Sequence, residues 1–89
     1  MEFEWDEQKR LSNLAKHGLD FADAERFDWS TVTGVADKRF EYGEERFRAF
    51  EMLDGRLVVL AFTFRGSVVR IFSFRPANRQ ERRSYGPKE

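Results

Sequence analysis

The chain has 89 residues, no net charge and 40% hydrophobic side chains, ten of them Phe. This is enough apolar material for one small core, so we expect a single domain over residues 1–89 rather than a disordered chain. The absence of cysteine excludes disulfides and thiolate metal sites, and one histidine offers no ligand spacing, so we expect neither metal nor cofactor. No apolar run reaches the length of about 18 residues that a membrane helix needs, and the acidic start is unlike a signal peptide. We therefore expect a cytoplasmic protein with no membrane contact.

The zero net charge conceals a division along the chain. Residues 1–64 hold nine Lys/Arg and fourteen Asp/Glu, which gives −5, whereas residues 65–89 hold seven Lys/Arg and two Glu, which gives +5. This asymmetry indicates a nucleic-acid-binding surface, a fold in which one half neutralises the other, or a solvated basic tail. Phe and Tyr between the arginines disfavour the tail, because a tail does not need them.

The first elements are a short strand and a helix. Residues 2–5 alternate acidic and aromatic side chains, which predicts an edge strand. Asp6 is placed to cap a helix that ends near His17, with Gly18 in the left-handed position that often follows a helix. The apolar side of this helix, which we expect to face the core, carries Leu11, Leu14 and Ala15. The opposite face carries Lys9, Asn13 and Lys16.

A second short helix is predicted from Asp20 to about Phe27, with Phe21, Ala24 and Phe27 on one side. Residues 28–44 have a weaker pattern that includes one strand-like stretch. After them, three runs rich in β-branched and aromatic residues are separated by Asp-Gly and Gly-Ser, which favour type I′ and II′ hairpin turns. Asn78 then caps a final helix. The order predicts an α+β fold, with two N-terminal helices packed on an antiparallel sheet and a short C-terminal helix.

The two turns set the register of the three predicted strands. Arg48 then lies opposite Ala61, and Thr63 lies opposite Arg70. The face turned away from the core is predicted to carry Arg46, Arg48, Phe50, Met52, Leu57, Val59, Ala61, Thr63, Arg65, Arg70, Phe72 and Phe74. Regular alternation places Ser73 and Arg75 on the core face instead.

Four arginines close together on one face repel each other unless something neutralises them. Glu44, Glu45 and the acidic N-terminal half are one possible source of neutralisation. The other is a bound anion, and a phosphodiester backbone is the anion that spans several arginines. The groups available as a general base are Glu44, Glu51, Glu81, His17 and Tyr85, and each also has an ordinary structural interpretation.

Several spaced motifs resemble those of the BrnT-like toxins. The stretch WDEQKRLSNLAKHGLDF is similar to their opening motif, W-D-x-x-K-x-x-x-N-x-x-K-H-G-x-x-F, and RIFSFRPANRQERRSY is similar to their closing motif, R-I-x-S-x-R-x-A-x-x-x-E-R-x-x-Y. The resemblance covers nearly the whole chain except residues 28–40. It implies a RelE-like α+β fold and a ribonuclease toxin of a type II toxin–antitoxin system that cleaves RNA without a metal and inhibits translation. It also implies a BrnA-like antitoxin with a ribbon-helix-helix domain, and contact with operator DNA only through the antitoxin complex.

The resemblance and the predicted register together give the candidate site residues. The closing motif, carried over onto this chain, makes Ser73 a candidate and implies catalytic roles for Arg70, Arg75, Glu81 and Tyr85. RNA binding is expected of Arg46, Arg48, Arg65, Arg79 and Arg82. Contact with the antitoxin is expected of Lys9, Asn13 and Lys16, for which a plain solvated helix face is the alternative. The motif and the register disagree about Arg75, since alternation places it on the core face.

Two functions are compatible with these residues. The favoured one is an RNA-cleaving toxin in which Arg70 and Arg75 bind the scissile phosphate and Tyr85 or a glutamate transfers the 2′-hydroxyl proton. The alternative is a non-catalytic module whose basic face docks an acidic protein partner or nucleic acid.

Overall fold

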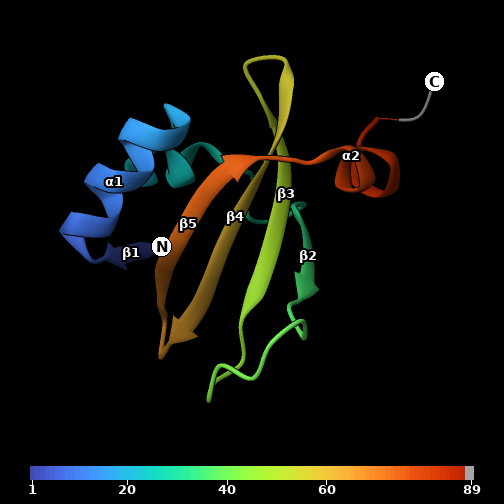
Figure 1. The fold of residues 1–89 in the computed structure, drawn as a ribbon. Coiled ribbons are helices and arrows are strands. Elements are labelled where there is room, and N and C mark those ends of the chain that lie inside the picture. The colour runs from blue at the N-terminus through green and yellow to red at the C-terminus, as the bar shows by residue number, and fades with distance from the viewer. Residues whose placement is uncertain (88–89) are drawn as a thin grey trace.

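Five strands form a single mixed sheet in the order β1-β5-β4-β3-β2 (Figure 1). The computed structural model describes residues 1–87, so the last two residues of the predicted 1–89 domain lie outside the described part. The elements are β1 (Glu2–Trp5), α1 (Glu7–His17), the 3₁₀ helix η1 (Phe21–Arg26), β2 (Thr33–Ala36), β3 (Phe47–Leu53), β4 (Arg56–Arg65), β5 (Val68–Pro76) and α2 (Arg79–Tyr85).

The meander β3-β4-β5 confirms the predicted turns and the register next to them. Asp54 and Gly55 both have positive φ, 52° and 83°, as a type I′ turn requires, and Gly66 has a φ of 63°, as the first central residue of a type II′ turn requires. Leu53 pairs with Arg56, and Arg65 pairs with Val68. The two turn sequences therefore predict the pairing of the residues next to them correctly.

The N-terminal strand lies at the edge of the sheet, as predicted, but it runs parallel to β5, with Glu4 opposite Arg70. The expectation of a purely antiparallel sheet is therefore wrong. A parallel neighbour needs a long connection, and here the whole chain between β1 and β5 provides it.

Helix α1 has the predicted ends but the opposite orientation. The Asp6 side chain accepts hydrogen bonds from the backbone at its start, and Gly18 has a φ of 70° at its end. The predicted apolar side is exposed, however, with Leu11 51% and Leu14 36% accessible, whereas Asn13 is buried. The prediction that Leu11, Leu14 and Ala15 face the core is therefore wrong, as is the placement of Asn13 on the exposed face.

The cause of this orientation is the open edge of β5. Strand β1 pairs only as far as Ile71, so the backbone of Phe74 has no strand beside it on that side. Asn13 fills the place of a strand: its amide donates to the Phe74 carbonyl at 2.7 Å and accepts from the Phe74 N–H at 3.1 Å. The second amide hydrogen goes to the Leu19 carbonyl at 3.0 Å. Because a buried backbone edge needs polar partners, α1 turns its polar side inward.

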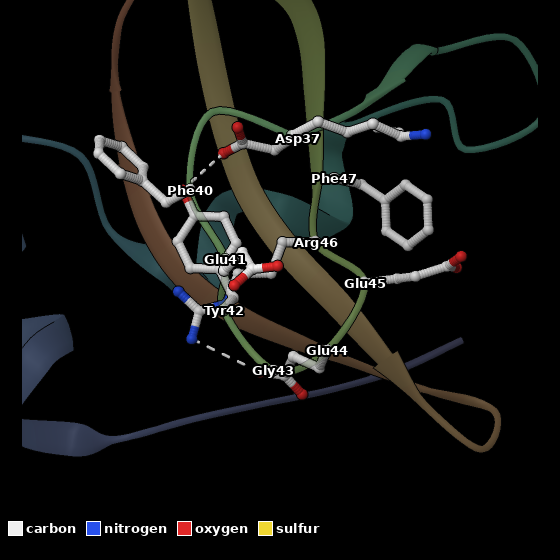
Figure 2. A pocket seen from close by; sticks show the side chains of 11 residues that line it. Asp37, Phe40, Glu41, Tyr42, Gly43, Glu44, Glu45, Arg46 and Phe47 are labelled. Atoms are coloured by element: carbon white, nitrogen blue, oxygen red, sulfur yellow. Dashed lines mark hydrogen bonds and ion pairs between the residues drawn. The ribbon is translucent and has the colours of Figure 1, made fainter.

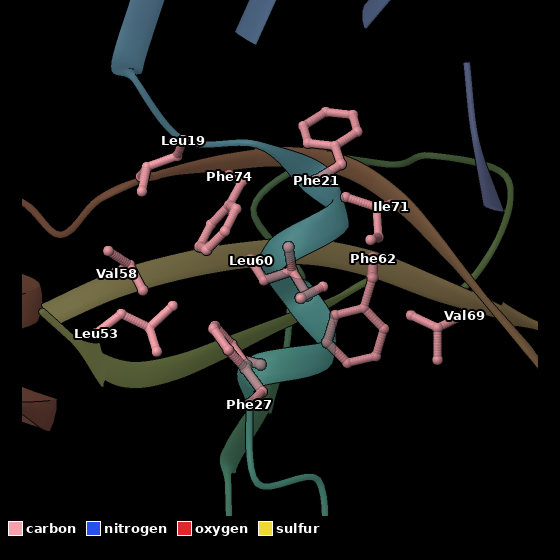
Figure 3. Close-up of a cluster of buried hydrophobic side chains, with 12 residues drawn as sticks. Leu19, Phe21, Phe27, Leu53, Val58, Leu60, Phe62, Val69, Ile71 and Phe74 are labelled. Carbon is pink, nitrogen blue, oxygen red and sulfur yellow. The ribbon is translucent and has the colours of Figure 1, made fainter. Parts of the chain in front are cut away.

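The second predicted helix is a 3₁₀ helix of six residues, so the expectation of two N-terminal helices packed on the sheet is only partly right. Helix α1 lies beside the edge of β5, while η1 crosses the core face of the sheet (Figures 1 and 3). Phe21, Ala24 and Phe27 point from η1 and its end into the main core, as the pattern predicted. The sheet side of this core consists of Ala49, Leu53, Val58, Leu60, Phe62, Val69, Ile71 and Phe74.

A β-bulge in β5 changes which side chains share a face. Phe62 pairs with Ile71 but Ala61 pairs with Ser73, which leaves Phe72 as an extra residue. Beyond this point the alternation is reversed. Phe74 is therefore fully buried in the main core, and Arg75 lies opposite Val59 on the arginine-bearing face. The predicted faces of Ser73, Phe74 and Arg75 are wrong for this reason.

Helix α2 crosses the other face of the sheet at the end near the Asp54-Gly55 turn (Figure 1). There a smaller core of Phe50, Leu57, Val59 and Ala77 is covered by Tyr85. The Tyr85 ring stacks on Phe50 with a centroid distance of 4.0 Å. Within residues 1–87, no helix is long and apolar enough to cross a membrane.

Replacing Asn13 with Ala should lower the free energy of unfolding by about 2 kcal/mol, because the buried N–H and C=O of Phe74 lose their hydrogen-bond partner. Urea denaturation at neutral pH measures the change. The control is Ser12→Ala at the exposed neighbouring position, for which we expect a change within about 0.5 kcal/mol. Equal stability of the two variants would contradict the role given to Asn13.

Candidate functional site

Five arginines gather on the sheet face that η1 does not cover, and we call this surface the arginine face. Arg48 and Arg70 lie opposite Ala61 and Thr63, whose side chains share one face of β4. The bulge adds one more arginine from the end of β5. The complete set is Arg46, Arg48, Arg65, Arg70 and Arg75. The solvated-tail interpretation is therefore wrong for Arg65, Arg70 and Arg75, which belong to the sheet.

Each of these arginines forms an ion pair inside the chain. Arg70 contacts Glu4 of the parallel strand β1 at 2.6 Å. Glu44 contacts Arg46 at 3.5 Å and Arg65 at 3.6 Å. Two of the predicted sources of neutralisation, Glu44 and the acidic N-terminal segment, are thus confirmed.

Glu81 is the third acid, and it joins β5, β3 and α2. Its carboxylate accepts from Arg75 at 2.7 and 3.0 Å, from Arg48 at 3.0 Å and from the backbone N–H of Asn78 at 2.9 Å. Asn78 accepts in return from the Glu81 N–H, which completes a capping box at the start of α2. Hydrogen bonds from Arg75 lower the pKa of Glu81 from 4.5 to about 2, against the effect of burial. Glu81 is therefore a carboxylate at neutral pH and a weak proton acceptor.

Arg46 is held between two aromatic rings. Its guanidinium lies 4.3 Å from the centroid of Tyr42 and 3.9 Å from that of Phe72. Figure 2 shows Arg46 directed toward Glu44 and the Tyr42 side chain beside it. The Nε atoms of Arg46 and Arg48 are buried and have no hydrogen-bond partner among the described residues. A buried donor of this kind is costly unless it gains a partner.

The loop between β2 and β3 encloses a hollow of about 630 Å³ (Figure 2). Its charged lining consists of Asp37, Glu41, Glu44, Glu45, Lys38 and Arg46. Tyr42 donates to Asp37 at 3.1 Å, and hydrogen bonds from Arg39 hold the pKa of the Asp37 carboxyl well below its ordinary value. Four acids against two cations disfavour a phosphate here, so the arginine face is the better anion site.

A second hollow, of about 480 Å³, lies between α1 and β5, and we call it the α1–β5 groove. Lys9, Lys16 and His17 line it from the helix, and Phe72 and Ser73 line it from the strand. Burial and the positive charges of Lys16 and Arg75 lower the pKa of His17 below its ordinary value of 6.5. At neutral pH, His17 is therefore an uncharged imidazole that can accept a proton.

The candidate residues of α2 occupy two different positions. Tyr85 lines a hollow with Arg48 and Glu81 next to the arginine face. Arg82 donates to the Ala77 carbonyl at 2.8 Å, and Arg79 is exposed on the first turn of the helix. The structure thus brings Tyr85 and Glu81 together with Arg48, and Glu81 together with Arg75. Arg79 lies exposed on α2, and Arg82 lines a separate hollow with Met52 and Leu57.

The sequence analysis did not identify Glu4 and Tyr42 as parts of this surface. The sequence pattern predicts Glu4 only as one residue of an alternating strand, because no feature of the sequence indicates that this strand pairs in parallel with β5. Alternation predicts the correct face for Phe72, but the bulge that moves Arg75 to the same face leaves no local signal in the sequence. The position of Arg75 in the closing motif was the one available indication.

Replacing Glu81 with Gln should cost on the order of 3 kcal/mol of unfolding free energy at pH 7, from the pKa difference between 4.5 and about 2. Because the folded-state pKa is the lower one, this stabilisation is complete above pH 4.5 and disappears as the pH falls toward 2. The gap between the wild type and the variant in urea denaturation should therefore narrow over that range. Glu25→Gln, at an exposed position on η1, is the control. A gap that stays constant with pH would contradict this account of Glu81.

Comparison with known proteins agrees with the architecture and the motifs. A family model described as "Ribonuclease toxin, BrnT, of type II toxin-antitoxin system" matches residues 5–81. The 1.1 Å crystal structure of the Brucella abortus ribonuclease toxin BrnT is 32% identical to this chain, with a TM-score of 0.72, and the match covers 89% of this chain and 99% of that one. No curated protein matches the chain. Since the family model spans most of the sequence and the solved structure shares its fold, this chain belongs to the BrnT family of ribonuclease toxins of type II toxin–antitoxin systems.

Proposed function

We propose that this toxin cleaves RNA on the arginine face and needs no metal ion for the reaction. The observation that carries the proposal is the charge balance of that face. Five guanidinium groups are paired with only three carboxylates, Glu4, Glu44 and Glu81, which leaves two positive charges in excess. An RNA backbone supplies several negative charges at the spacing of such a surface.

Arg70 and Arg75 are the groups we assign to the scissile phosphate. Both side chains are one-quarter exposed, so a phosphate can reach them. The planar guanidinium binds two phosphate oxygens at once and keeps its charge at every physiological pH. As the 2′-oxygen attacks phosphorus, these fixed charges stabilise the negative charge that develops on the pentavalent phosphate. Arg46, Arg48 and Arg65 hold the flanking phosphates, and Arg79 and Arg82 extend the surface along α2.

The proton of the 2′-hydroxyl needs an acceptor, and we assign this role to His17. Glu81 is a poor candidate, because its carboxylate is held by two arginines and has a pKa of about 2. Glu81 instead positions Arg48 and Arg75. His17 is uncharged at neutral pH and lines the α1–β5 groove, and the positive charge of Arg75 contributes to lowering its pKa. Tyr85, from the opposite side of the face, is the candidate for protonating the leaving 5′-oxygen, which yields a 2′,3′-cyclic phosphate.

A toxin of a type II system has an antitoxin as its partner. We infer that this antitoxin is a BrnA-like protein with a ribbon-helix-helix domain, that it covers the arginine face or blocks the way to it, and that operator DNA is bound only through the complex. An acidic segment would suit this role, since it can replace Glu4 and Glu44 on their arginines. Both amide hydrogens of Asn13 are used within the chain, so Lys9 and Lys16 remain the exposed candidates on α1. The site of action of such a toxin is the cytoplasm, where its RNA substrate lies.

Replacing Arg70 and Arg75 together with Ala should abolish the growth arrest that the toxin causes when it is expressed without an antitoxin, because the scissile phosphate loses both charges. In vitro, labelled RNA incubated in EDTA should acquire 2′,3′-cyclic ends with the wild type and none with the variant. Arg26→Ala is the matched control, since Arg26 belongs to η1 on the other side of the sheet and pairs with Asp54. A fully toxic double variant would refute the assignment, and a wild type that binds RNA in EDTA without cleaving it would refute metal-independent catalysis.

His17→Gln should slow single-turnover cleavage at pH 7 by about 10²-fold or more, the usual contribution of a general base. In the wild type the rate should rise with pH through a pKa below 6.5, because only the uncharged imidazole accepts a proton. The variant should lack this rise. A variant that keeps the wild-type rate and pH profile would remove His17 from the mechanism and leave Tyr85 as the main candidate.

A further inference from the structure

The α1–β5 groove joins the arginine face at the edge of β5 but differs from it in charge balance. Among the described residues, neither Lys9 nor Lys16 forms an ion pair, whereas every arginine of the arginine face does. Asp6 also lines the groove, but its carboxylate accepts from the backbone at the start of α1. The groove therefore offers two ammonium groups that form no ion pair within the described residues, against the single carboxylate of Asp6.

An aromatic ring lies beside these two cations. Phe72 is the extra residue of the bulge, so its side chain projects toward the arginine face and the groove instead of into the main core. The ring is half-buried, with the Arg46 guanidinium 3.9 Å and the Lys9 ammonium 5.8 Å from its centroid. Aromatic rings flanked by cations are what proteins use to hold single-stranded nucleic acid, since the ring stacks on a base and the cations bind the backbone.

The groove is continuous with the proposed site of cleavage. Ser73 lines the groove and lies in the same cross-strand row as Ala61 and Arg48 on the arginine face. His17 lines the groove as well, and its pKa is lowered partly by the charge of Arg75. A strand of RNA bound across the arginine face therefore has the groove as its next position.

We propose that the α1–β5 groove binds the nucleotide adjacent to the scissile phosphate, with its base stacked on Phe72 and its outer phosphate held by Lys9 and Lys16. This inference rests on the proposed ribonuclease function of the arginine face. It assigns to RNA the two lysines that the sequence pattern assigned to the antitoxin. An acidic protein segment would use the lysines but would gain little from the ring, so the ring favours the nucleic acid.

The test uses a fluorescent single-stranded RNA that is 2′-O-methylated throughout, so that it binds but is not cleaved. We expect Phe72→Leu to weaken binding about tenfold and Phe72→Trp to retain it, because stacking is lost in the first and kept in the second. Lys9→Ala with Lys16→Ala should reduce the slope of log affinity against log salt by about 0.7, the value for one phosphate contact on a single strand. Phe64→Leu is the control, since Phe64 is a 51% exposed ring that packs beside Phe47 and Phe62.

Because Arg46 lies against the Phe72 ring, Phe72→Leu could weaken RNA binding by displacing Arg46. A probe with a single abasic position separates this effect from the loss of base stacking. Moved along the strand, the abasic position should weaken wild-type binding at one place, and Phe72→Leu should remove that position dependence. The inference is overturned if Phe72→Leu and the double lysine variant bind the probe as the wild type does. It is also overturned if these lysine substitutions weaken binding of a poly-glutamate peptide but not of RNA.

Cleavage of unmodified RNA in EDTA distinguishes this inference from the function on which it rests. If the wild type cleaves RNA and the groove variants have an unchanged KM, nucleotide binding in the groove is refuted but the proposed reaction is not. A wild type that does not cleave refutes the proposed reaction, while binding of the methylated probe still decides whether the groove holds a nucleotide. Thermal unfolding of each variant, followed by circular dichroism, excludes loss of the fold as the cause.

Discussion

The two hydrogen bonds between Asn13 and the backbone of Phe74 hold together the parts on which the rest of the structure depends. They complete the edge of β5 where β1 no longer pairs with it, and they fix α1 at that edge. They also hold β5 immediately after the bulge, where the alternation of its side chains has just reversed. Phe74 can then enter the main core while Arg75, the next residue, turns to the arginine face. One amide side chain thus links the position of the helix, the packing of the core and the composition of the site.

In the absence of RNA, three glutamates from three different parts of the chain pair with the arginines of the arginine face. Glu4 comes from the parallel edge strand, Glu44 from the loop before β3 and Glu81 from α2. Exposed ion pairs of this kind contribute little to stability, so Glu4 and Glu44 can give way to a phosphate at small cost. Glu81 is different, since its carboxylate is buried and holds both Arg48 and Arg75. It keeps those two side chains in place while the outer pairs open.

The extent to which the fold follows from the sequence can be judged from particular residues. Asp6, Gly18, Asn78 and the two hairpin dipeptides act locally, so the ends of the helices and the register near the turns were predictable. The orientation of α1 was not, because the leucine spacing that predicts a buried side is outweighed by a backbone edge contributed by a strand about 60 residues away. The alternation of side chains likewise does not predict the bulge at Phe72, which places Arg75 on the opposite face of the sheet from the one expected. The register predicted four members of the arginine face, Arg46, Arg48, Arg65 and Arg70, whereas Glu81 as its central acid required the tertiary structure.

The capping box of α2 has a consequence for cooperativity. The carboxylate that begins the helix is the same group that holds Arg48 and Arg75 together. Unwinding the first turn of α2 therefore releases both guanidiniums, and separating the guanidiniums removes the acceptor that starts the helix. The C-terminal helix and the centre of the arginine face form one opening unit, whose free energy can be read from hydrogen exchange at the backbone amides of Asn78 and Glu81.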